Sequence, residues 1–99
     1  MIRHVVLCRF RKDADVAAIF AAIEGLKQKI PGILAVTCGT DCSPEGLQKR
    51  FTHGFTVDFT DAAARDAYLP HPDHQVVAKM VVDALDGGLE GLVVIDWAY

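Results

Sequence analysis

Between residues 51 and 59 the chain alternates large, mostly apolar side chains with small or polar ones at every second position. Successive side chains of a β-strand point to opposite faces of the sheet, so this alternation predicts a strand with one buried face. The large side chains are those of Phe51, His53, Phe55, Val57 and Phe59. The rest of the chain must therefore supply a core that covers this face.

Further strands are predicted where β-branched and apolar residues gather. These segments are residues 2–11, 33–40 and 89–97. In the first segment, period two places His4 on a face with four apolar residues, and Val5 and Leu7 on the opposite face. The polar stretch 43–50, which contains Pro and Gly, predicts a surface loop between the second and third strands.

Apolar residues at three-and-four spacing predict a first helix that Asp13 or Asp15 can cap. Its apolar stripe consists of Val16, Ile19, Phe20, Ile23, Leu26 and Ile30. A short second helix is predicted over 62–68, with Thr60 as its cap and a proline after its end. A third helix is predicted over 73–85, before a pair of glycines.

The predicted order is strand, helix, strand, strand, helix, strand, two βαβ-like halves that indicate an α+β, ferredoxin-like sandwich in a single domain over 1–99. We expect the first and third strands to be parallel neighbours at the centre of the sheet, with the helices on one face. The other face would remain open and would carry Val5, Leu7, Thr52 and Thr56. Such a half-apolar open face predicts a homodimer.

Composition excludes several classes of protein. A chain of 99 residues has room for one core and not for a multidomain enzyme. Ten Lys and Arg against 13 Asp and Glu lack the basic excess of nucleic-acid-binding proteins. No apolar stretch reaches the roughly 18 to 20 residues that cross a bilayer, and the N-terminal segment is unlike a signal peptide, so we expect a cytoplasmic protein. The three cysteines match no common zinc spacing, and no cofactor is expected.

Four polar rings are the candidates for chemistry. His4 and His53 share the apolar faces of their strands, and as parallel neighbours they would lie close together. The turn between the last two helices would bring Tyr68 and His74 over the same end of the sheet. Histidine exchanges a proton near neutral pH, and a tyrosine hydroxyl can stabilise a developing oxyanion, so the four rings could serve acid and base catalysis in an apolar pocket.

Two other interpretations use the same histidines. In one, they are core residues with satisfied hydrogen bonds and no chemical role. In the other, imidazoles and Asp73 bind zinc, copper or nickel, with His71 and His74 close in sequence. The first interpretation predicts a noncatalytic protein and the second a metal-binding protein. The preferred interpretation, acid and base catalysis in an apolar pocket, involves no metal.

Four segments together resemble the stress-responsive dimeric A/B barrel family, called Dabb. They are IRHVVL at 2–7, IPGI at 30–33, THGF at 52–55 and DAYLPHPDH at 66–74. The most specific part is the Tyr-x-x-His-Pro-x-His turn, taken together with the strand histidine and the Thr-His pair. The resemblance implies a ferredoxin-like domain that dimerises through its sheet into a barrel.

The resemblance also implies roles for individual residues. Some plant members are polyketide cyclases in which a histidine acts as base and a tyrosine assists, and these positions are similar to His74 and Tyr68. His4 and His53 would line the pocket with Phe55, and Ile23 stands where the cyclases offer a further tyrosine. We therefore expect His74 and Tyr68 as catalytic residues and His4, His53, Ile23 and Phe55 as substrate-binding residues. The ligand would be a small apolar carbonyl compound, and a stress protein without a reaction is the alternative.

Overall fold

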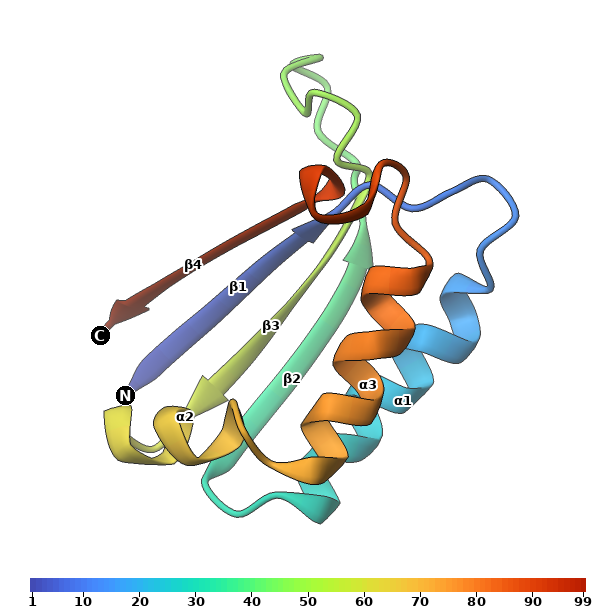
Figure 1. The fold of residues 1–99 in the computed structure, drawn as a ribbon. Helices are drawn as coiled ribbons and strands as arrows, with labels where there is room; N and C mark the ends of the chain where they lie inside the picture. Colours follow the sequence, from blue (N-terminus) through green and yellow to red (C-terminus); the bar gives the residue numbers. More distant parts are fainter.

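The computed structural model describes all 99 residues, which form a four-stranded sheet with helices packed on one face (Figure 1). The predicted fold class, an α+β ferredoxin-like sandwich, is confirmed. The elements in chain order are β1 (Ile2–Cys8), α1 (Val16–Lys29), β2 (Ile33–Thr40), β3 (His53–Phe59), α2 (Ala62–Tyr68), α3 (Pro72–Asp83), the 3₁₀ turn η1 (Gly88–Gly91) and β4 (Leu92–Ala98). No helix combines the length and the apolar character needed to cross a membrane.

The strand order is β2-β3-β1-β4, and every neighbouring pair is antiparallel. The prediction that β1 and β3 run parallel is therefore wrong. Figure 1 shows why: the crossover through α1 returns β2 in the direction of β1, and the following loop reverses the chain into β3. In the resulting register His4 lies opposite Val57, and Cys8 lies opposite His53.

Local interactions explain where the helices begin. The carboxylate of Asp15 accepts a hydrogen bond from the Ala18 amide at 3.1 Å and caps α1. Asp61, and not Thr60 as the sequence indicated, caps α2 by accepting from the Ala64 amide at 2.8 Å. In both cases a side-chain oxygen satisfies an amide that has no partner inside the helix.

The turn from α1 into β2 requires a glycine. Gly32 has φ +89°, and a Cβ at this position would lie 2.6 Å from the Cβ of Ala64 in α2. The Gly32 carbonyl also accepts a hydrogen bond from the Thr60 amide at 3.0 Å. The turn thereby holds the start of α2 at the end of the sheet where β2 begins and β3 ends.

β1 ends earlier than expected, at Cys8, because the chain then pairs with the segment between α3 and β4. The Arg9 amide donates to the Gly91 carbonyl at 2.8 Å, and Phe10 forms an isolated bridge with Leu85. Residues 9–12 consequently belong to the end of the molecule where that segment, the β2–β3 loop and the start of α1 meet (Figure 1).

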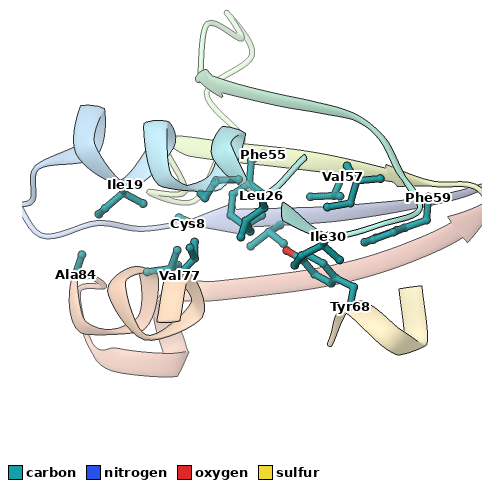
Figure 2. Close-up of a cluster of buried hydrophobic side chains, with 14 of the residues drawn as sticks. Cys8, Ile19, Leu26, Ile30, Phe55, Val57, Phe59, Tyr68, Val77 and Ala84 are labelled. Carbon is teal, nitrogen blue, oxygen red and sulfur yellow. The ribbon is translucent and has the colours of Figure 1, made fainter. Parts of the chain in front are cut away.

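The core lies between the sheet and the helices, as the alternation predicted (Figure 2). Its largest fully buried side chains are Tyr68, Phe59, Ile23, Leu26, Val57 and Cys8. Burying one such apolar side chain stabilises a fold by about 1.5–3 kcal/mol. The other face of the sheet is not covered by any element and exposes Leu7, Ile95 and Trp97.

Candidate active site

A cavity of about 210 Å³ lies between the sheet and the helices, and 11 of its 13 lining residues are hydrophobic. Its walls come from both layers of the fold: strands β1, β3 and β4 of the sheet, and α1, α2, α3 and the α2–α3 loop of the helical layer. The lining residues are His4, Val6, Ile23, Phe55, Tyr68, Leu69, His74, Val77, Ala78, Val81, Val82, Leu92 and Val94. The cavity thus brings together His4, Tyr68, His74, Ile23 and Phe55, five of the six residues chosen from the sequence.

His74 enters the cavity from the first turn of α3 with one ring nitrogen already bonded. Its Nδ1 lies 2.9 Å from the Leu69 carbonyl oxygen, which can only accept, so Nδ1 carries the proton. In the neutral imidazole the lone pair then lies on Nε2. Burial lowers the pKa of His74 more than the Leu69 bond raises it, and the charges of His4 and His71 lower it further. At neutral pH His74 is therefore an unprotonated base.

Tyr68 lies beside His74 and is only 2% exposed. The two rings are 4.1 Å apart between centroids, with 35° between their planes. Figure 2 shows the Tyr68 oxygen pointing from α2 back toward the buried side chains. Burial raises the pKa of Tyr68 to about 12. The phenol thus keeps its proton at neutral pH and can act as a hydrogen-bond donor.

The loop between α2 and α3 sets this geometry. Pro72 occupies the first turn of α3, where a missing amide hydrogen costs nothing. His71 caps the helix, because its Nδ1 accepts from the Asp73 amide at 3.1 Å. His71 is therefore a structural residue of the turn, and His74 follows on the helix at the cavity wall.

His4 is held by a carboxylate that sequence reasoning missed. The His4 residue is 6% exposed, and its Nδ1 lies 2.8 Å from Oδ1 of Asp96, directly opposite it on β4. The other oxygen, Oδ2, accepts from Arg65 Nη1 at 2.8 Å. Burial alone would raise the pKa of Asp96, but the hydrogen bonds from Arg65 and His4 outweigh it and hold that pKa below its usual value. A single carboxylate within the apolar strand β4 was the available signal.

His53 does not line the cavity, which corrects the prediction that it lies near His4. His53 is four positions from Val57, the partner of His4, and this corresponds to about 13 Å along an extended strand. The His53 ring packs instead against Phe10 and Phe20, at centroid distances of 5.5 and 6.0 Å. The antiparallel run of β1 and β3 is the cause, because it sends their N-terminal ends to opposite ends of the sheet.

No group of three or more His, Cys, Asp and Glu side chains is arranged to hold a metal ion. The nearest approach to the metal interpretation is His71 Nδ1 and Asp73 Oδ2, which are 3.9 Å apart. His74 is turned toward Leu69 and the cavity. His74 therefore does not join His71 and Asp73 as a third metal ligand.

The fold and the cavity define a class of small α+β domains with one histidine- and tyrosine-containing apolar pocket. Comparison with known proteins gives the particular family: residues 2–99 match the Stress responsive A/B Barrel Domain, Dabb, and the chain belongs to this family. Stress-response A/B barrel domain-containing protein HS1 of Arabidopsis thaliana is 30% identical over 99 residues, which cover 97% of this chain and 87% of that protein.

Solved structures share the whole fold. A dimeric ferredoxin-like protein of unknown function from Jannaschia sp. CCS1 superposes with a TM-score of 0.89 at 31% identity, covering 99% of this chain and 98% of that one. A hydroxynitrile lyase from Passiflora edulis superposes with a TM-score of 0.85 at 24% identity, covering 97% and 90%. The similarity to the hydroxynitrile lyase is a similarity of fold.

Proposed function

We propose that this chain forms a homodimer in which each subunit binds a small apolar carbonyl compound in its cavity and moves a proton on it. The observation that carries the proposal is the composition of the cavity: an almost wholly hydrophobic wall with His4, Tyr68 and His74 as its polar rings. An apolar pocket with a few convergent polar groups is the usual form of a small-molecule site.

The reaction that these groups favour is enolisation. His74 Nε2 takes a proton from the carbon next to the carbonyl, and the electron pair of the broken C–H bond moves into the enolate. The Tyr68 hydroxyl donates a hydrogen bond to the oxygen that becomes negative. Return of the proton to carbon completes an exchange without a cofactor. Alternatively, the enolate carbon attacks a second carbonyl of the same molecule, and the alkoxide formed there takes the proton from His74 Nε2.

His4 has a positioning part in this proposal. Its Nδ1–H donates to Asp96, so Nε2 is the remaining polar atom that it can offer to a ligand. Asp96 is itself fixed by Arg65, which limits the freedom of the His4 ring. A carbonyl compound with a second polar group can be oriented by this nitrogen.

The test is hydrogen–deuterium exchange at the carbon next to the carbonyl of a small ketone such as 2-heptanone, followed by NMR in D₂O. We expect His74→Gln to slow the catalysed exchange by about 10²–10⁴-fold, the usual contribution of a general base. Tyr68→Phe should reduce it while the protein stays folded, and His53→Gln is the matched control outside the cavity. Absence of catalysed exchange with a panel of small ketones and aldehydes would favour the noncatalytic stress protein.

The homodimer rests on the open face of the sheet. Leu7, Ile95 and Trp97 are 41%, 54% and 46% exposed and lie on neighbouring strands β1 and β4. Exposed apolar residues that adjoin one another mark an association surface. Related structures, including the Jannaschia protein, are described as dimeric.

Light scattering tests this part of the proposal separately. We expect a mass of twice the 10.8 kDa of one chain, and Ile95→Lys should shift it toward the monomer. Val76→Lys is the matched control, because Val76 is 65% exposed on α3, on the opposite side of the molecule. A monomer for the unsubstituted chain at micromolar concentration would contradict the proposal.

A further inference from the structure

A second hollow lies at the end of the sheet remote from His4, and four cationic side chains line it. Besides these cations, its lining consists of Phe10, Thr52 and Asp86. The cations are Arg9, Arg11, Lys12 and Arg50. They come from the β1–α1 connection and the β2–β3 loop, which are brought together only by the fold. Four positive charges against one lining carboxylate contrast with the net charge of −3 of the whole chain.

Two of these cations have no ionic partner. Lys12 and Arg50 form neither a salt bridge nor a side-chain hydrogen bond, whereas Arg11 is bonded to Asp13 and to the Asp83 carbonyl. Like charges that share one hollow repel each other, and this repulsion is relieved when an anion binds between them. The hollow therefore carries positive charge without an ionic partner on both connections that form it, at Lys12 and at Arg50.

Arg9 is held in place yet incompletely bonded. Its guanidinium lies over the ring of Phe51 at 5.6 Å and donates one hydrogen bond, from Nη2 to the Asp86 carbonyl at 3.1 Å. Its buried Nε has no hydrogen-bond partner, since the nearest Asp86 oxygen is 4.0 Å away. An arginine with unused donors that is already oriented by an aromatic ring loses little freedom when it binds a ligand.

The β2–β3 loop presents Arg50 in a restricted backbone conformation. Lys49 and Arg50 are the only non-glycine residues with positive φ, at 52° and 68°. Such a conformation costs free energy for a residue with a Cβ, and it recurs at ligand-binding sites. In this chain the two residues with that conformation are consecutive basic residues, and they directly precede Phe51.

We infer that this hollow binds the phosphate group of a small phosphorylated molecule, at a site separate from the apolar cavity. Arg50 and Arg9 offer planar, forked donors that match two phosphate oxygens, and Lys12 adds a point charge. Thr52 Oγ1 lies at the rim, bonded to His53 Nδ1 at 2.9 Å. The inference does not depend on the reaction proposed for the cavity.

An NMR titration with inorganic phosphate tests the inference, with sodium chloride used to hold the ionic strength constant. We expect saturable shifts of the backbone amides at 9–12 and 50–52, and none at 68–74. The double variant Lys12→Gln, Arg50→Gln should weaken binding at least tenfold, because each charged hydrogen bond lost is worth that much. Both residues are exposed and lie on loops, so the variant should keep the NMR spectrum of the folded chain.

The control is the double variant Lys27→Gln, Lys29→Gln, which removes the same two positive charges at exposed positions in the last turn of α1. It should leave the phosphate affinity unchanged; an equal loss in this variant would show only general charge attraction and would overturn the inference. Shifts that never saturate would also overturn it. A second arm uses phosphatidylcholine vesicles with and without phosphatidic acid, and pelleting with the acidic vesicles in the absence of any free-phosphate shift would overturn the assignment to a small molecule.

Discussion

His4 and His53 project from the same face of one sheet, yet their surroundings differ in kind. His4 borders the cavity and is bonded to Asp96, a carboxylate that Arg65 also holds. His53 packs between two phenylalanines and is bonded to a threonine at the surface. Both positions satisfy the same period-two pattern. The comparison teaches that the pattern specifies the face a side chain uses, while strand direction determines its neighbours.

The largest difference between the two histidines is expected in stability. His4→Ala removes a donor from Asp96 inside the fold and enlarges the cavity, and should lower the free energy of unfolding by about 2–3 kcal/mol. His53→Ala loses ring contacts and one exposed hydrogen bond, so about 1 kcal/mol is expected. Urea unfolding of the two variants measures these changes. Equal losses of unfolding free energy would contradict the proposed difference between His4 and His53.

The carboxylate beside His4 should make stability depend on acid pH. The pKa of Asp96 is lower in the folded chain than its ordinary 3.8, so its hydrogen bonds stabilise the fold above that pH. This contribution is lost as the pH falls from about 3.8 through the lower folded value. Asp96→Asn should cost about 1–2 kcal/mol at neutral pH and flatten that part of the curve. A curve with the original slope in the variant would contradict the assignment.

His74 should act in the same sense as Asp96, but at higher pH. Its pKa is lowered on folding, so the unfolded chain takes up a proton first as the pH falls below the ordinary value of 6.5. Stability therefore declines below that pH, by at most about 1.4 kcal/mol per pH unit, and levels off below the folded pKa. Thermal unfolding of His74→Gln between neutral and mildly acid pH should lack this decline. An unchanged decline would assign it to another histidine.

The smallest effect is expected at the partner of His53. Thr52→Val removes the hydroxyl that lies 2.9 Å from His53 Nδ1, in an exposed position. Because water can replace this bond, we expect a change of about 0.5 kcal/mol or less in the free energy of unfolding. A loss comparable to that of Asp96→Asn would show that His53 is held as firmly as His4.

Much of this arrangement could be predicted from the sequence, since periodicity gave the number, order and burial of the elements. The antiparallel register could also have been derived, because a crossover followed by a reversal must turn β3 against β1. The partnership of His4 with Asp96 depends on β1 and β4 being neighbours, which no local pattern states. The cavity depends on how Ile23 and Phe55 pack, and side-chain volumes alone do not determine it.

The central place of β1 has a consequence for how fast the chain can fold. Its partner β4 lies more than 80 residues away along the chain, with Ile2 paired to Ala98 and His4 to Asp96. Closing so long a loop costs conformational entropy before any contact offsets it, and chains dominated by distant contacts fold in milliseconds to seconds rather than microseconds. The hydrogen bond that orients His4 can form only once β4 has paired with β1, so the candidate active site cannot be complete before the two ends of the chain meet.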